Sequence, residues 1–211
     1  MPADDVEALV DGRLAEAAAA TNALSSDPEL PRRIAAAGRA MADACAGGNK
    51  VILMGNGGSA AEATHLAGEL VGRYLADRDP LPALALADSQ SSLTAIANDD
   101  SYEETFARQV RAFAVPGDVV VALSTSGRSR NVVLGLSAAR EMGALTIGLT
   151  GRDGGEVAPL CDHLLAVPST ETPRVQEGHA VIGHTLCEIV ERAVTGGSGD
   201  EGRHRTRDSG S

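Results

Sequence analysis

Lysine is almost missing from this chain of 211 residues, since Lys50 is the only lysine among 18 basic residues. A mechanism through a Schiff base would depend on that one amine and is therefore disfavoured. Aromatic residues make up 2% of the chain and tryptophan is absent, which disfavours ligand recognition by ring stacking. We expect polar side chains and backbone groups to do the recognising.

Other absences exclude whole classes of protein. The three cysteines, Cys45, Cys161 and Cys187, form no C-x-x-C pair, so buried reduced thiols are expected. No apolar run reaches the length of a membrane span. The net charge of −11 argues against a nucleic-acid or anionic-membrane surface. The N-terminus is acidic where a secretory signal is basic, which predicts a cytoplasmic protein that binds neither nucleic acid nor membrane.

Most of the chain alternates between expected strands and expected helices. We predict strands near 50–54, 83–87, 118–123, 144–149 and 163–167, and helices near 59–71, 90–97, 101–113, 129–142 and 173–194. This alternation predicts an α/β fold, a three-layer αβα sandwich with a central parallel sheet. Ligands in such folds gather at the carboxyl ends of the strands.

Two Ala-rich helices, at about 5–24 and 30–46, precede this pattern. They are consistent with an oligomer-forming bundle and equally with a helical cover on the same subunit. From Thr195 onward the sequence is Gly, Ser and charge without apolar residues, as in a disordered tail. We therefore divide the chain into an N-terminal helical oligomerisation segment (1–48), an α/β domain (49–194) and a tail (195–211).

The first candidate binding loop is the glycine-rich segment VILMGNGGS, in which a buried strand breaks into a loop that opens a helix. Such a junction presents free backbone N–H groups and a positive dipole end to an anion. Ser59, with Glu62 three residues later, predicts a capping box. The loop lacks the last glycine of G-x-G-x-x-G and the lysine of a Walker A loop, so nucleotide binding is not indicated.

The second candidate loop follows the strand VVVALS and precedes the helix NVVLGLSAARE. It carries the four hydroxyls of Ser124, Thr125, Ser126 and Ser129. Hydroxyls combined with free amides suit a phosphate where lysine is absent. On its own, the segment also fits an ordinary capped turn.

Two remote segments each supply a pair of metal-capable side chains. His65 and Glu69 are spaced i, i+4, so both project from one face of a helix, although such a pair is usually a surface hydrogen bond. Gln176 and His184 are eight residues apart, about 12 Å along a helix. They meet one ion only if they lean together, if Gln176 lies in a distorted first turn, or if different subunits contribute.

The motifs together resemble one family, the sedoheptulose-7-phosphate isomerases or phosphoheptose isomerases of the sugar isomerase (SIS) domain superfamily. The resemblance runs from about residue 5 to 194, through GNGGSAAEATHLAGELVGR, LTAIANDDSYEETFARQV, GDVVVALSTSGRSRNV, LTGRDGGE and RVQEGHAVIGHTLCEIVE. It implies a SIS fold, a homotetramer with sites at subunit interfaces, and bound zinc. The implied reaction converts sedoheptulose 7-phosphate to D-glycero-D-manno-heptose 7-phosphate.

The resemblance also implies roles for individual residues, and all the family's functional positions match. Glu69 and His184 are the implied catalytic pair. The implied zinc-associated residues are His65, Glu69, Gln176 and His184, and the implied substrate-binding residues are Asn56, Gly57, Gly58, Glu69, Asn98, Asp99, Ser124, Thr125, Ser126, Ser129 and Gln176.

The reaction gives these residue types a chemical reason. Moving a carbonyl between C2 and C1 needs a base, a stabiliser of the enediolate and a proton donor. Zinc would polarise both oxygens as a Lewis acid. A carboxylate held tightly by zinc is a weakened base, so we hypothesise that Glu69 is shared between metal and proton transfer.

Two other functions compete with the isomerase. Non-enzymatic relatives that associate with a replication initiator share the glycine loop and the AIAND segment, but as a family they lack the second metal histidine. The presence of His184 therefore favours the enzyme. The second alternative is a sugar-phosphate sensor of the kind attached to transcription regulators. The sequence has no DNA-binding segment or basic patch to support it.

Overall fold

The computed structural model describes residues 3–196, and it contains one parallel sheet of five strands in the order β2-β1-β3-β4-β5. The predicted tail therefore lies, from residue 197 onward, outside the described residues. The strands are β1 (Val51–Gly55), β2 (Ala83–Ala85), β3 (Val119–Ser124), β4 (Leu145–Thr150) and β5 (His163–Ala166). Each neighbouring pair runs parallel, which confirms the predicted α/β class.

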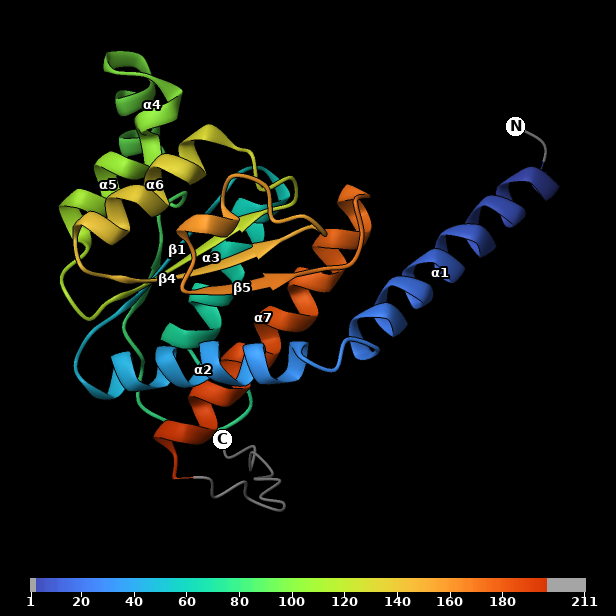
Figure 1. Ribbon diagram of the computed structural model, residues 1–211, viewed down its shortest axis with the longest axis horizontal. Coiled ribbons are helices and arrows are strands. Elements are labelled where there is room, and N and C mark those ends of the chain that lie inside the picture. Colours follow the sequence, from blue (N-terminus) through green and yellow to red (C-terminus); the bar gives the residue numbers. More distant parts are fainter. Residues whose placement is uncertain (1–2, 197–211) are drawn as a thin grey trace, which may run out of the picture.

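Helices cover both faces of the sheet, which confirms the three-layer sandwich (Figure 1). The strand residues Leu53 and Val121 pack into a core with α2 (Leu30–Ala46), α3 (Gly58–Val71) and α7 (Thr172–Val194). Their neighbours Ile52 and Val120 face the opposite core, beneath α5 (Thr105–Phe113) and α6 (Arg130–Glu141). Successive side chains of a strand point to opposite faces, so uniformly apolar strands feed both cores.

Helix α1 (Ala3–Ser25) leaves the body of the molecule, as its dark blue ribbon shows (Figure 1). Near its C-terminal end, Leu24 is buried in the core. Towards its N-terminus, the apolar side chains of Val6, Leu9, Val10 and Leu14 are exposed. Of the two N-terminal helices, α2 thus covers the sheet of its own subunit and α1 does not.

Element boundaries agree with the predictions to within one or two residues, with two local exceptions. The expected helix 101–113 is divided into a 3-10 turn, η1 (Tyr102–Glu104), and α5. The capping box at Ser59 is wrong, because the helix begins at Gly58 and its N-cap is Gly57, which has φ of +56° and makes no side-chain cap bond. A left-handed glycine turns the chain into the helix before Ser59, and the Ser59 side chain is buried.

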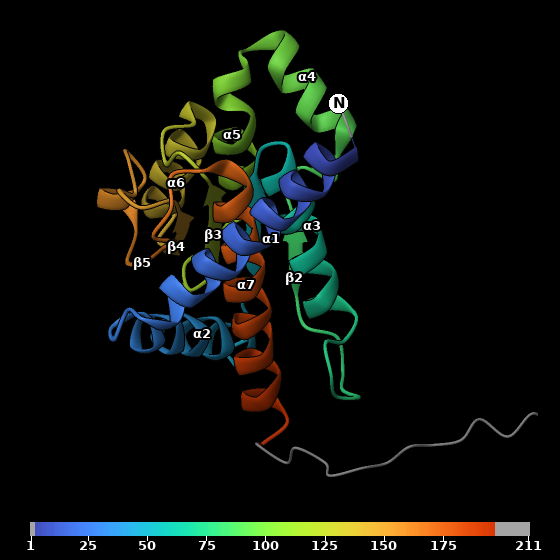
Figure 2. The same cartoon turned by 90° about the vertical axis from the view of Figure 1, so that its right-hand side faces the viewer.

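All five strands end at the same edge of the sheet, so the loops that follow them lie together there. β1 and β3 are direct neighbours, with Gly55 opposite Leu123. The two predicted binding loops therefore start side by side. Helix α4 (Gln90–Asp99) stands above this edge and buries none of its residues (Figure 2). Among the residues described, no helix is long and apolar enough to cross a membrane.

Candidate active site

A reciprocal pair of amide hydrogen bonds joins the glycine loop (Asn56–Gly58) to the loop of hydroxyl residues at Ser124–Ser129, which we call the hydroxyl loop. Asn56 Nδ2 donates to Asn131 Oδ1 over 2.8 Å, and Asn131 Nδ2 donates back to Asn56 Oδ1 over 2.9 Å. The Tyr102 hydroxyl also donates to Asn56 Oδ1, at 2.8 Å. Because Asn131 opens α6 directly after the hydroxyl loop, these bonds fix the glycine loop relative to the hydroxyl loop.

Hydrogen bonds also shape the hydroxyl loop from within. The buried Ser124 hydroxyl donates to Ser129 Oγ over 3.3 Å and accepts from the Gly127 amide over 3.2 Å. Ser126 Oγ accepts from the Arg128 amide over 3.1 Å. The loop is thus preformed, and its turn brings hydroxyls and amides to one place without a lysine.

Arg128, within this loop, forms an ion pair with Asp153. Its guanidinium lies 2.6 Å from Asp153 Oδ2, and this hydrogen bond holds the pKa of the Asp153 carboxyl below its ordinary value. Both side chains are more than half exposed, so the pair contributes little to stability. The Asp153 carboxylate therefore offsets part of the positive charge that Arg128 brings to the loop.

Helices α3 and α7 lie side by side (Figure 2). They bring together two histidines whose residue numbers differ by 119. His65 Nε2 and His184 Nε2 are 2.8 Å apart, with the rings edge-on at 87°. Glu69 Oε1 lies 3.7 Å from His65 Nε2. The i, i+4 pair on α3 is therefore not isolated, because α7 delivers an imidazole to it.

Tyr74 lies on the other side of His184. The two rings are stacked, with centroids 5.6 Å apart and an interplanar angle of 20°. Tyr74 belongs to the loop after α3, so this loop closes one flank of the histidine pair. The His184 imidazole is consequently held between His65 and an aromatic ring.

Gln176 reaches the glycine loop. A Cβ built on Gly58 would overlap the Gln176 carboxamide, so the absence of a side chain at Gly58 is what gives the carboxamide its place. Gln176 lies in the first turns of α7, two helical turns before His184. The four metal-capable residues are thus arranged as a group of three, His65, Glu69 and His184, and a carboxamide against the loop.

The donor atoms of His65, Glu69 and His184 are of the types that bind zinc in proteins. Two imidazole nitrogens and a carboxylate oxygen are typical zinc donors, and at bond lengths of about 2.0–2.1 Å they lie roughly 3.4 Å apart in a tetrahedral site. The Glu69 to His65 separation of 3.7 Å is close to this value, whereas the two imidazoles at 2.8 Å share a hydrogen bond. Within residues 3–196, no three His, Cys, Asp or Glu side chains are already gathered as a metal cluster.

Asn98 and Asp99 lie apart from this group, at the exposed C-terminal end of α4. Asn98 Nδ2 donates to Asp99 Oδ1 over 2.9 Å. No residue of α4 is fully buried, and the helix contacts the core through the partly buried Leu93, so these two side chains stand above the loops on a lightly packed helix.

Comparisons with known proteins agree with this arrangement. The SIS domain family matches residues 16–151. The phosphoheptose isomerase of Geotalea daltonii is 53% identical over 168 residues, which are 80% of this chain and 88% of that protein. This chain belongs to the phosphoheptose isomerase family. The resemblance drawn from the motifs is thereby confirmed.

Solved members of the phosphoheptose isomerase family share the fold. The structure from Neisseria gonorrhoeae is 38% identical, with a TM-score of 0.80 over 88% of this chain and 98% of that chain. The structure from Francisella tularensis is 31% identical, with a TM-score of 0.85 over 91% of this chain and all of the other.

Several residues of this phosphoheptose isomerase family member escaped the sequence analysis. Tyr74 contacts His184, and both Tyr102 and Asn131 contact Asn56. Tyr74 and Tyr102 are the only tyrosines in the chain, and this scarcity was the one available signal. Asn131 gave none, because its partner Asn56 lies 75 positions away in the sequence.

Proposed function

We propose that this chain is an aldose–ketose isomerase that converts sedoheptulose 7-phosphate to D-glycero-D-manno-heptose 7-phosphate. Membership of the phosphoheptose isomerase family supports the reaction. The convergence of His65 and His184, beside Glu69, is the single observation that carries the catalytic assignment. A protein that only sensed or bound a sugar phosphate would have no need of paired imidazoles next to a carboxylate.

The hydroxyl loop binds the substrate phosphate in this proposal. Thr125, Ser126 and Ser129 surround the N-terminus of α6, where free amides and the helix dipole favour an anion. The buried hydroxyl of Ser124 holds the loop in shape. The sugar lies along the glycine loop, Asn56 to Gly58, with Gln176 beside it and with Asn98 and Asp99 above.

Glu69 and His184 carry the proton transfers. Glu69, with 22% of its side chain exposed, removes a proton from the carbon next to the carbonyl. His184 delivers a proton to the neighbouring carbon, and its ring is kept in place by the stack on Tyr74. His65 bridges the two, since its Nε2 lies within 4 Å of both.

Zinc is the proposed cofactor, held by His65, Glu69, Gln176 and His184. The donor types support this, and Gln176 would join the other three by leaning from the first turns of α7. Bound there, zinc would supply Lewis acidity to stabilise the negative charge that develops on the substrate. The chain's own part is to hold the imidazoles and the carboxylate on two facing helices.

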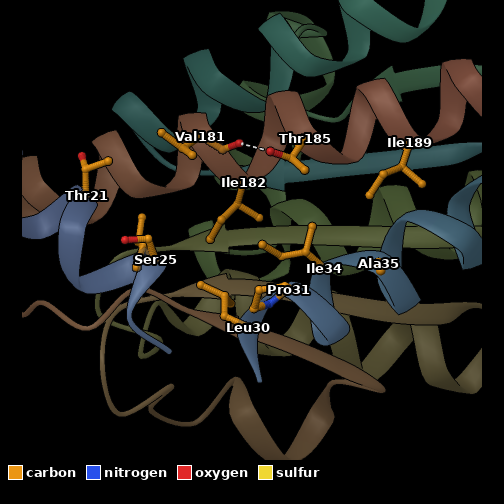
Figure 3. Close-up of a pocket in the computed structure, with 11 residues that line it drawn as sticks. Thr21, Ser25, Leu30, Pro31, Ile34, Ala35, Val181, Ile182, Thr185 and Ile189 are labelled. Carbon is orange, nitrogen blue, oxygen red and sulfur yellow. Dashed lines mark hydrogen bonds between the residues drawn. The ribbon is translucent and has the colours of Figure 1, made fainter. Parts of the chain in front are cut away.

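We further propose a homotetramer in which segment 1–48 forms contacts between copies. The exposed apolar residues of α1, Val6, Leu9, Val10 and Leu14, support this, because a lone projecting helix gains stability by burying them. A groove of about 360 Å³ lies where α1 ends, between α2 and α7, and Ile34 and Ile182 point into it (Figure 3). A second copy would cover this groove, and its approach would place the sites at subunit interfaces.

The test is isomerisation of sedoheptulose 7-phosphate by the purified protein, before and after chelation and after zinc is returned. Formation of the aldose with solvent deuterium at C2 is the expected result for an enediol route. Full activity after complete metal removal would refute the zinc role, and absence of turnover in the zinc-loaded protein would refute the isomerase.

The variant Glu69→Gln separates chemistry from binding. It should abolish turnover while leaving substrate binding, since the carboxamide keeps the shape of the side chain but cannot accept the proton. Near-normal turnover of this variant would remove Glu69 from the mechanism.

A further inference from the structure

A buried carboxylate on α7 gathers the loop that follows α3. Glu191 accepts hydrogen bonds from the backbone amides of Tyr74, Leu75 and Ala76 at 3.0, 2.8 and 2.7 Å. It also pairs with Arg78, whose Nε lies 3.2 Å from Glu191 Oε2. Burial alone would raise the pKa of Glu191, but the three amides and the guanidinium outweigh it and hold the pKa below its ordinary value.

Arg78 continues the network to the end of α3. Its guanidinium donates to the backbone carbonyls of Glu69 at 2.8 Å, Leu70 at 3.0 Å and Asp79 at 2.9 Å. Carbonyls in the last turn of a helix have no partner within the helix, and a cation there also suits the dipole. Arg78 therefore caps α3 while it is bound to α7 through Glu191. We call Arg78, Glu191 and the loop 72–77 the clasp.

The clasp touches the candidate site at both helices. On α3, it holds the backbone of Glu69. On the α7 side, it holds the amide of Tyr74, whose ring is stacked on His184. At the contact between the helices, Gly183 leaves room for Leu66, so α3 and α7 come close just before His184.

The stability of the fold does not by itself explain why Arg78 and Glu191 form a buried ion pair. The side chains of Arg78 and Glu191 are 4% and 3% exposed. A buried ion pair recovers little more than its desolvation cost, and apolar residues of similar volume often serve stability as well. What a network of directed bonds provides instead is a fixed spacing and orientation of the elements that it joins.

We propose that Arg78 and Glu191 are positioning residues that set the distance between His65 and Glu69 on α3 and His184 on α7. Through this distance they determine the affinity of the site for zinc. The ring of Tyr74, stacked on the imidazole of His184, fixes the orientation of that imidazole. The inference rests on the proposed function, because it assigns a role to residues that support the proposed metal site.

Glu191→Gln is the informative variant, and the chain provides a matched control. Asp118 is likewise a fully buried carboxylate that accepts backbone amides, from Lys50 and Val115, and pairs with a cation, the Lys50 ammonium. It precedes β3 and so lies at the opposite edge of the sheet from the site. Asp118→Asn therefore removes a comparable charge network without touching α3 or α7.

The measurement is the zinc affinity of each folded protein, by competition with a chromophoric chelator, with thermal unfolding followed in parallel. Both variants should lose stability, but only Glu191→Gln should bind zinc about 10–100-fold more weakly, as is usual when a residue supporting a metal ligand is changed. Tyr74→Leu should weaken zinc binding, whereas Tyr74→Phe, which keeps the ring, should bind zinc with nearly the affinity of the wild type. Arg78→Lys keeps the charge but loses the fork of donors, so it should resemble Glu191→Gln.

Two outcomes overturn the proposal at different levels. Equal zinc affinity for wild type, Glu191→Gln and Asp118→Asn would show that the clasp only stabilises the fold. Failure of the wild-type protein itself to bind zinc would overturn the metal role of both the clasp and the proposed function.

Discussion

His179 on α7 provides a direct test of the electrostatics of the core. Its side chain is 1% exposed, and neither ring nitrogen has a hydrogen-bond partner in the described residues. Burial lowers the pKa of His179 from 6.5 to about 4, against a smaller opposing effect of the Thr150 backbone. The folded protein therefore keeps this imidazole neutral under conditions where the unfolded chain protonates it.

The sign and size of the effect follow from the two pKa values. At pH above 6.5 both states are neutral at this residue, and as the pH falls towards 4 only the unfolded state gains the proton. The free energy of unfolding must then decrease, by about 1.4 kcal/mol for each unit that separates the pKa values and roughly 3 kcal/mol in all. Between about pH 7 and about pH 5, the loss is about 2 kcal/mol.

The perturbation is His179→Leu, which replaces the imidazole by an apolar side chain that cannot titrate. Urea unfolding at both pH values, at equal protein concentration, should show wild type losing about 2 kcal/mol more than the variant. Carboxylates such as Asp118 and Glu191 are present in both proteins, so their contributions cancel in the difference. The same pH dependence in wild type and variant would refute the reasoning.

Other predictions concern the loops and the thiols. Asn131→Ala removes the amide pair between the loops and should raise KM about tenfold, from one or two lost bonds of roughly 1 kcal/mol each; steady-state kinetics showing an unchanged KM would contradict the role. Gly58→Ala should displace the Gln176 carboxamide and reduce activity, while Gly68→Ala, which meets nothing within 4 Å, should keep activity and gain up to about 1 kcal/mol by urea unfolding. Burial raises the pKa of Cys187 to about 12, so mass spectrometry should detect its alkylation only after unfolding; rapid labelling of the native protein would show that the thiol is accessible.

Periodicity and turn residues predicted the order and type of the elements. The helix 30–46 was predicted with the bounds that the structure has, and the structure places Pro31 in its first turn and Gly47 at its C-cap. The errors were local and had local causes. The capping box at Ser59 failed because Gly57 adopts a left-handed conformation that only the three-dimensional loop requires.

The candidate site was only partly predictable. The positions of the two loops followed from β1 and β3, whose carboxyl ends must lie at one edge of a parallel sheet. The clasp was not predictable, since nothing in the sequence near Glu191 indicates that it binds the amides of a loop more than 110 residues away. Contacts of this kind depend on how helices cross, and local sequence patterns do not encode crossing geometry.

The amino-acid sequence alone determined which chemical groups this protein possesses and at which strand ends its loops lie, because both follow from residue type and from short-range periodicity. Only the tertiary structure decided which of those groups meet. The close packing of α3 on α7 brings His65 to His184, stacks Tyr74 on that imidazole and leaves Gln176 against Gly58. These contacts depend on how the side chains of α3 and α7 fill the space between the two helices. The side chains that must fit together there come from positions far apart in the sequence.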